Sequence, residues 1–73
     1  MAKFVGRVSR SDLEGGHWVL ITDHGVTYQL QGGGPDLLSD GARAEVEGRV
    51  AGGKMGIAML GDILEVRHYR LLG

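Results

Sequence analysis

The sequence has 73 residues, no cysteine and a formal net charge of -1. A chain of this length predicts one domain, residues 1–73, that buries only about 60% of the surface exposed on unfolding. The lack of cysteine excludes disulfides, thiol catalysis and cysteine-based metal centres. Hydrophobic residues make up 42% of the chain, which indicates a packed core, and the 14 glycines indicate many tight turns.

The first half of the chain predicts three short strands. Residues 3–10 are rich in β-forming side chains, and Gly6 among them indicates a bend or a bulge. Residues 17–22 and 26–31 form the second and third strands, and the third alternates apolar with polar residues. The Asp-His-Gly sequence between them predicts a three-residue hairpin loop that ends in a left-handed glycine.

This hairpin loop sets the register of the two strands. With three loop residues, Leu20 lies opposite Tyr28, and directly opposed residues share a face of the sheet. Four side chains are then expected to line the core: Trp18, Leu20, Tyr28 and Leu30. Four others are expected on the outer face: Val19, Ile21, Thr27 and Gln29. A two-residue turn would exchange the faces of the second strand, so the assignment depends on the turn.

Residues 35–41 predict one short helical turn between the third and fourth strands. Proline suits the first helical position, and Gly41 suits the position after the helix ends. We expect Leu37 and Leu38 to close one end of a barrel.

The last third of the chain predicts two further strands. Residues 42–50 alternate small or apolar residues with charged ones, the pattern of a half-buried antiparallel strand. After a turn at 51–56, residues 57–60 and 62–70 are expected to continue as one bent strand, interrupted by glycine.

The order of these elements predicts an all-β domain with one short helical turn. Three meandering strands, a capping turn and a final hairpin are the plan of the OB-fold, a five-stranded Greek-key barrel. An SH3-like barrel is the alternative, although that fold usually lacks a helix between its third and fourth strands. The expected bend at Gly6 favours the OB-like plan, because the first strand of such a barrel serves both halves.

Several stretches carry a resemblance to a known group. Residues 6–8, 11–16, 18–20, 23–30, 46–50 and 64–66 together look like small stand-alone bacterial OB-like proteins, a group of largely unassigned function. The resemblance covers most of the chain and implies a bacterial, cytoplasmic protein, but it carries no catalytic signature and no residue roles. A cytoplasmic location is also expected because the start has no signal-peptide pattern and no apolar run approaches the roughly 20 residues of a membrane span.

The residues that carry chemistry form no catalytic or metal-binding pattern. His17, His24 and His68 are far apart and lack the spacing of a metal site. No serine stands in a G-x-S-x-G motif. The run from Gly32 to Gly34 precedes a turn but lacks the Lys-Ser/Thr of a phosphate-binding loop, so it is interpreted as a flexible connection. The sequence therefore predicts a protein that is not an enzyme and needs no metal or cofactor.

Two binding functions remain open. Protein–protein contact or self-association would use the outer face of the hairpin, namely Val19, Ile21, Thr27 and Gln29, with further apolar surface from Met55, Met59, Leu71 and Leu72. Burial of Val19 and Ile21 in a thicker barrel wall is the competing interpretation.

Single-stranded nucleic-acid binding is the alternative function, because OB barrels often bind such strands on basic and aromatic surfaces. It would use Arg7, Arg10, Arg67, Arg70 and an outward-facing Tyr69, provided that the first and last strands are neighbours. The slightly acidic balance of charge favours protein contact over nucleic acid.

Overall fold

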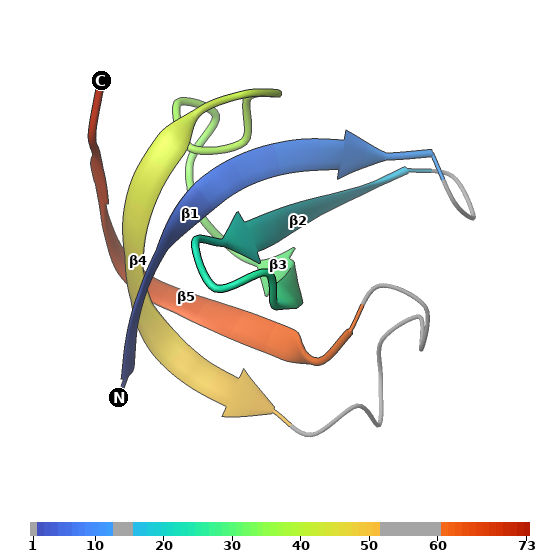
Figure 1. The fold of residues 1–73 in the computed structure, drawn as a ribbon, viewed down its shortest axis with the longest axis vertical. Coiled ribbons are helices and arrows are strands. Elements are labelled where there is room, and N and C mark those ends of the chain that lie inside the picture. The colour runs from blue at the N-terminus through green and yellow to red at the C-terminus, as the bar shows by residue number, and fades with distance from the viewer. Residues whose placement is uncertain (1, 13–15, 52–60) are drawn as a thin grey trace.

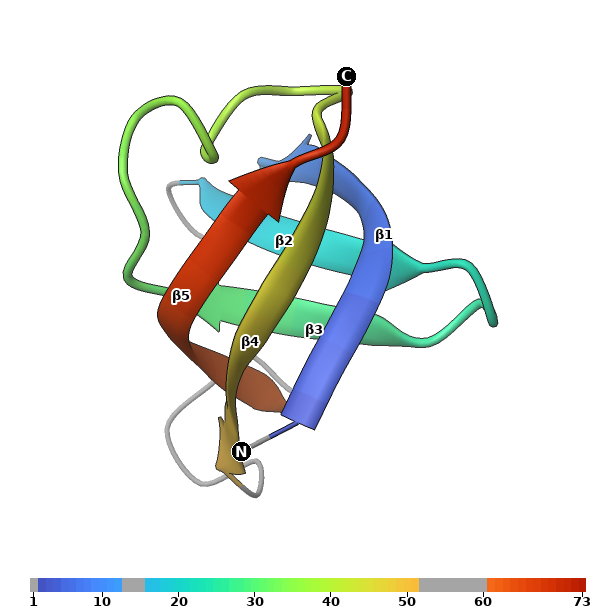
Figure 2. The same cartoon turned by 90° about the vertical axis from the view of Figure 1, so that its left-hand side faces the viewer.

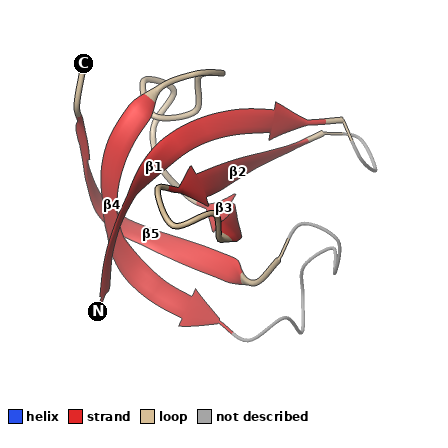
Figure 3. Ribbon diagram, viewed as in Figure 1, coloured by secondary structure: helices blue, strands red, loops and turns tan. Residues whose placement is uncertain are grey.

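The computed structural model describes residues 2–12, 16–51 and 61–73, and all their regular structure is β-strand (Figures 1 and 3). Five strands follow one another along the chain: β1 (Ala2–Ser11), β2 (His17–Thr22), β3 (Thr27–Gln31), β4 (Arg43–Ala51) and β5 (Ile63–Leu71). The prediction of an all-β chain is confirmed, and the bounds of these strands agree with those expected to within one residue. The strand expected at 57–60 and the two methionines at 55 and 59 lie outside the described residues.

The five strands form one sheet in the order β1-β2-β3-β5-β4, and β4 pairs back with β1 to close it into a barrel (Figure 2). Neighbouring strands are antiparallel except β3 and β5, which run parallel over three residue pairs, from Gln29 with Ile63 to Gln31 with Glu65. Closure leaves few strand edges open, which suits a small β-domain.

Strand β1 belongs to both halves of the barrel. Its residues Gly6–Ser11 pair with β2, and its residues Ala2–Arg7 pair with β4. The two pairings overlap at Gly6 and Arg7, and an added Cβ on Gly6 would lie 2.2 Å from the carbonyl oxygen of Ile21. Only glycine lets β1 come this close to β2 while it turns toward β4, as the sequence predicts.

The β2–β3 hairpin has the predicted register. Leu20 pairs with Tyr28, and the Thr22 N–H donates to the carbonyl of Val26 at 2.8 Å. The three residues between these positions form the turn, with Gly25 at a φ of +83°. The three-residue loop is therefore confirmed, and with it the alternation of β2 side chains between the two faces.

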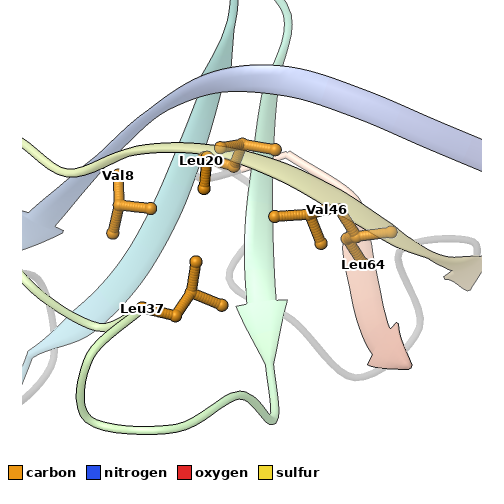
Figure 4. Packing of buried hydrophobic residues seen from close by; sticks show 6 residues of the cluster. Val8, Leu20, Leu37, Val46 and Leu64 are labelled. Carbon is orange, nitrogen blue, oxygen red and sulfur yellow. The ribbon is translucent and has the colours of Figure 1, made fainter. Parts of the chain in front are cut away.

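The core lies inside the closed sheet and draws on four strands. Six side chains are fully buried: Val8, Leu20, Leu37, Ala44, Val46 and Leu64 (Figure 4). Leu37 comes from the β3–β4 connection and fills the end of the barrel, as expected, and Leu38 packs beside it half-buried.

The connection that carries Leu37 makes one hydrogen-bonded turn at the start of the predicted residues 35–41 but forms no helix, which corrects that part of the prediction. The carbonyl of Gly34 accepts hydrogen bonds from the N–H groups of Leu37 and Leu38, and the segment then bends instead of adding a second helical turn. Gly41 ends it with a φ of +90°, so the predicted position of the terminating glycine holds although the helix is absent.

A bulge interrupts the pairing of β4 with β5. Glu47 pairs with His68, but the next residue, Gly48, pairs with Val66, so Arg67 is the extra residue. An added Cβ on Gly48 would lie 2.0 Å from the carbonyl oxygen of Glu65. The bulge reverses the faces of the β5 residues that follow it, because successive side chains of a strand point to opposite sides.

Candidate functional site

The predicted contact surface on the outer face of the hairpin is not one accessible patch. Val19 and Gln29 pair across the strands but are only 5% and 8% exposed, and Ile63, next to Gln29, is 6% exposed. Ile21 is 37% exposed, and Thr27 beside it is half-buried. Of the predicted pair, Val19 is therefore buried in the wall and Ile21 remains at the surface.

The arginines predicted to bind nucleic acid come from β1 and β5, which are not neighbouring strands. Strand β4 lies between β1 and β5, so the required neighbourhood of the first and last strands is not met. Arg67 pairs with Glu65 at 3.5 Å, and Arg70 pairs with Glu45 at 3.6 Å. These carboxylates lower the positive potential that a nucleic-acid backbone would require.

The two arginines of β1 lie in different surroundings. Arg10 lies over the Trp18 ring, 5.9 Å from its centroid, and its Nε lies 3.5 Å from a carboxylate oxygen of Asp12. Arg7 is exposed on the outer face of β1, where it pairs with Ile21 on one side and with Arg43 on the other.

Tyr69 does not face outward, which corrects the expectation from the sequence. It pairs with the buried Val46 and packs against the core cluster, and its phenol donates a hydrogen bond to Asp36 Oδ1 at 2.5 Å. The bulge at Arg67 is the physical reason, because it shifts the following residues of β5 to the opposite face.

The histidines stay apart in the structure. His17 begins β2, His24 lies in the β2–β3 turn, and His68 lies on β5. Within the ranges 2–12, 16–51 and 61–73, no three side chains of the metal-ligating acidic, histidine or cysteine types come together. The same ranges contain no helix of the length and apolarity needed to cross a membrane.

A cleft opens where β1 turns away from β2 toward β4. It has a volume of about 300 Å³ and lies between the first residues of β1 and the β2–β3 turn. We call it the turn cleft; it is lined by Lys3, Phe4, Val5, Thr22, Asp23, His24, Val26 and Tyr28.

The floor of the turn cleft is aromatic. The rings of Phe4 and Tyr28 lie 4.7 Å apart between centroids with an interplanar angle of 49°, and both pack against the core. Val26 stands beside them and is 47% exposed, the most exposed of the large hydrophobic residues in the described chain. Removing apolar surface from water is stabilising. A partner that covers this half-buried aromatic pair and the exposed valine would therefore gain binding free energy.

The carboxylate at the rim of the turn cleft is Asp23, and it is already paired. Arg43 donates two parallel hydrogen bonds to its oxygens, at 3.2 and 3.1 Å. These bonds hold the pKa of Asp23 below its ordinary value and raise the pKa of Arg43. Lys3 and His24 line the same rim and are exposed. With Asp23 neutralised by Arg43, the rim has a positive balance of charge.

A second depression of about 240 Å³ continues from the turn cleft. It is lined by Arg7, Ile21 and Arg43, and the two hollows share Thr22 and Asp23. The exposed Ile21 and the cation of Arg7 thus lie at one end of a surface strip, with Val26 and Lys3 at the other.

Sequence reasoning missed the turn cleft because its residues come from segments that only the bend of β1 brings together. One local signal points toward it: Gly6, which marks the divergence of β1 from β2.

Comparison of the chain with family models, with curated proteins and with solved structures gives no match. The resemblance to small bacterial OB-like proteins therefore stays a prediction from the residues that suggested it.

Proposed function

We propose that this protein is a small, non-enzymatic interaction module with an OB-like Greek-key barrel, and that it binds a protein segment in the turn cleft. The strand order supports the fold: a three-strand meander, a connection that plugs the barrel end with Leu37, and a final pair that closes the sheet through β3–β5 and β1–β4.

The observation that carries the function is the character of the turn cleft. Its floor is apolar and aromatic, its rim is polar, and Val26, which also lines it, is exposed. Interfaces share this anatomy, with an apolar centre inside a polar rim. A volume of about 300 Å³ is at the small end for ligand pockets, which suits one or two side chains of a protein segment better than a large cofactor.

Nucleic-acid binding receives less support from the geometry. Such binding needs exposed aromatic rings beside unpaired cations. In the described chain, Tyr69 packs inward, and Arg67 and Arg70 each lie next to a glutamate.

A random twelve-residue peptide library displayed on phage tests the proposal. The immobilised wild-type protein is compared with Val26→Arg, which fills the rim of the turn cleft, and with Leu72→Arg, a matched change at an exposed leucine outside that cleft. We expect peptides that are enriched on the wild type and on Leu72→Arg but not on Val26→Arg. No enrichment, or enrichment that ignores Val26→Arg, would overturn the proposal.

Two solution measurements identify other occupants. If light scattering finds a dimer at about 100 μM that Val26→Arg dissociates, the partner is a second copy and the cleft remains the contact site. If fluorescence anisotropy finds single-stranded DNA or RNA bound at about 50 mM salt irrespective of Val26→Arg, the function lies with nucleic acid and the proposal fails.

A further inference from the structure

We propose that the partner segment binds in the turn cleft as an added β-strand, hydrogen-bonded to the free edge of β1 at Lys3, and that it combines apolar with acidic side chains. The inference rests on the proposed function, because it names how the segment is held and what chemistry it carries. Strand addition to an open sheet edge is an established mode of peptide recognition.

The edge of β1 is open where it borders the turn cleft. Pairing with β2 begins at Gly6, so the preceding residues, Ala2–Val5, pair with β4 on one side and face the turn cleft on the other. Figure 2 shows this half of β1 running alongside β4, with the β2–β3 turn on its other side.

The hydrogen-bond directions along β1 follow from two bonds. The Val8 N–H donates to the carbonyl of Ala42 on the β4 side at 2.7 Å, and the Val5 carbonyl accepts from the Asp23 N–H in the turn at 3.0 Å. In an antiparallel ladder the backbone groups of successive residues point to opposite edges. The even-numbered residues of this half of β1 therefore bond β4, and the odd-numbered ones point away from it.

This alternation directs three backbone groups into the turn cleft. They are the N–H and carbonyl of Lys3 and the N–H of Val5, whose carbonyl is already used by Asp23. A strand that lies beside Lys3 can accept a hydrogen bond from its N–H and donate one to its carbonyl. The Val5 N–H offers a third hydrogen bond.

The side chains around the edge specify what such a strand carries. Side chains of an added strand alternate between the two sides of the sheet. On the inner side, one of them meets the Phe4 and Tyr28 rings and Val26, which favours an apolar residue. On the outer side, the next lies near Lys3, which favours a carboxylate.

The charge of this strip supports an acidic partner. Lys3 and Arg7 lie on the outer face of β1, and within the described chain neither side chain has a hydrogen-bond or ion-pair partner. Two carboxylates nearby are held elsewhere, Asp23 by Arg43 and Glu45 by Arg70. Glu47 lies opposite Lys3 in the β1–β4 register, on the side away from the open edge.

Backbone N-methylation tests whether the segment binds as a strand. Synthetic copies of the peptides enriched from the twelve-residue library are compared with copies N-methylated at alternate residues in each of the two registers. In one register we expect a loss of binding of about tenfold or more, because the bonds to Lys3 are blocked, and in the other little change. Equal binding of all three forms would overturn the strand.

Amide hydrogen exchange gives a second, variant-free readout. In the free protein, the N–H groups of Lys3 and Val5 should exchange faster than those of Phe4 and Gly6, which bond β4. Saturating peptide should slow exchange at Lys3 and Val5 alone. Unchanged exchange at both residues would show that a cleft-binding peptide is held only by its side chains.

Charge reversal tests the acidic character. We expect Lys3→Glu to weaken the enriched peptides about fivefold and Lys3→Arg to bind as the wild type does. Arg67→Glu, the same change of net charge on β5, is the matched control and should have little effect. If Lys3→Glu acts no more strongly than Arg67→Glu, the acidic preference is overturned. The proposed function itself fails in the two earlier cases, where no enriched peptide depends on Val26 or where nucleic acid binds irrespective of Val26→Arg.

Discussion

The phenol of Tyr69 on β5 donates a hydrogen bond of 2.5 Å to Oδ1 of Asp36, in the connection between β3 and β4. The same oxygen accepts the N–H of Leu37 at 3.1 Å. This pair of bonds ties β5 to the segment that carries Leu37 into the core. The hydrogen bond from Tyr69 holds the pKa of Asp36 below its ordinary value, and the bond to Asp36 together with burial raises the pKa of Tyr69.

Replacing this phenol should make the stability of the protein less dependent on pH. A carboxyl group whose pKa is lowered by folding contributes stability above its unfolded pKa of about 4 and loses it as the pH falls through the folded pKa. We therefore expect Tyr69→Phe to lower the free energy of unfolding at pH 7, with the difference from wild type vanishing under strongly acidic conditions. Denaturant unfolding of the wild type and Tyr69→Phe, at pH 7 and under strongly acidic conditions, measures this difference in the free energy of unfolding.

The control for that experiment is Tyr28→Phe, which removes a phenol that does not bond Asp36. A carbon-detected NMR titration of Asp36 completes the test, since Tyr69→Phe should raise the pKa of this carboxyl and Tyr28→Phe should leave it unchanged. At the alkaline end the raised pKa of Tyr69 contributes stability that is present below about pH 10 and is lost as Tyr69 ionises.

Gly48→Ala should be severely destabilising. The new Cβ would lie 2.0 Å from the carbonyl oxygen of Glu65, so backbone at the β4–β5 bulge would have to move. We expect a loss of roughly 3 kcal/mol or more, a large fraction of the stability of a domain this small. Gly25→Ala is the comparison: its Cβ meets nothing within 4 Å, and the cost of its φ of +83° should be about 1 kcal/mol. Equal losses in thermal unfolding would contradict the steric argument.

Leu37→Ala should cost more than Leu38→Ala. Leu37 is fully buried at the end of the barrel, and truncation of such a side chain typically costs about 2–5 kcal/mol because a cavity remains. Leu38 is half-buried, so its truncation removes less buried apolar surface and should cost less stability. Urea unfolding of the two variants compares the two losses of stability directly. A larger loss for Leu38→Ala would show that Leu37 is not the side chain that closes the end of the barrel.

Gln29→Met should stabilise the protein. The Nε2 group of Gln29 is buried on the outer face of β3 and has no hydrogen-bond partner among residues 2–12, 16–51 and 61–73. A buried donor left unsatisfied typically costs about 1–3 kcal/mol, and methionine has nearly the same shape without that donor. Gln31→Met, two residues along the same strand but exposed, should change the free energy of unfolding by less than about 0.5 kcal/mol. A destabilised Gln29→Met would mean that the amide is needed where it lies.

The parts of the fold that the sequence predicted depend on local chemistry. The Asp-His-Gly turn sets the β2–β3 register within a few residues, and the alternation of small and charged residues in β4 identifies its inner face. Tyr69 was misplaced because alternation counted from Leu64 puts it outside, and the extra residue at Arg67 that reverses this order arises only where β5 meets β4.

The candidate site was beyond local patterns for the same reason. Val19 and Ile21 are two residues apart in β2, so the alternation of the strand assigns both to the same outer face. Which of them is accessible depends on what packs over that face. The turn cleft needs the divergence of β1 from β2 at Gly6, which brings Lys3 and Phe4 beside Val26. The sequence shows the glycine, but it does not show the cleft that forms where β1 bends away from β2.

The pairing of β3 with β5 also sets how the chain reaches its native state. Gln29 pairs with Ile63, far along the chain, and this parallel contact spans only three residue pairs. The chain must therefore lose most of the entropy of a long loop before a short ladder compensates for it. We expect the β2–β3 hairpin to form early and the β3–β5 seam to close last, with folding in milliseconds to seconds rather than microseconds. Substitutions in that seam would then change the unfolding rate much more than the folding rate.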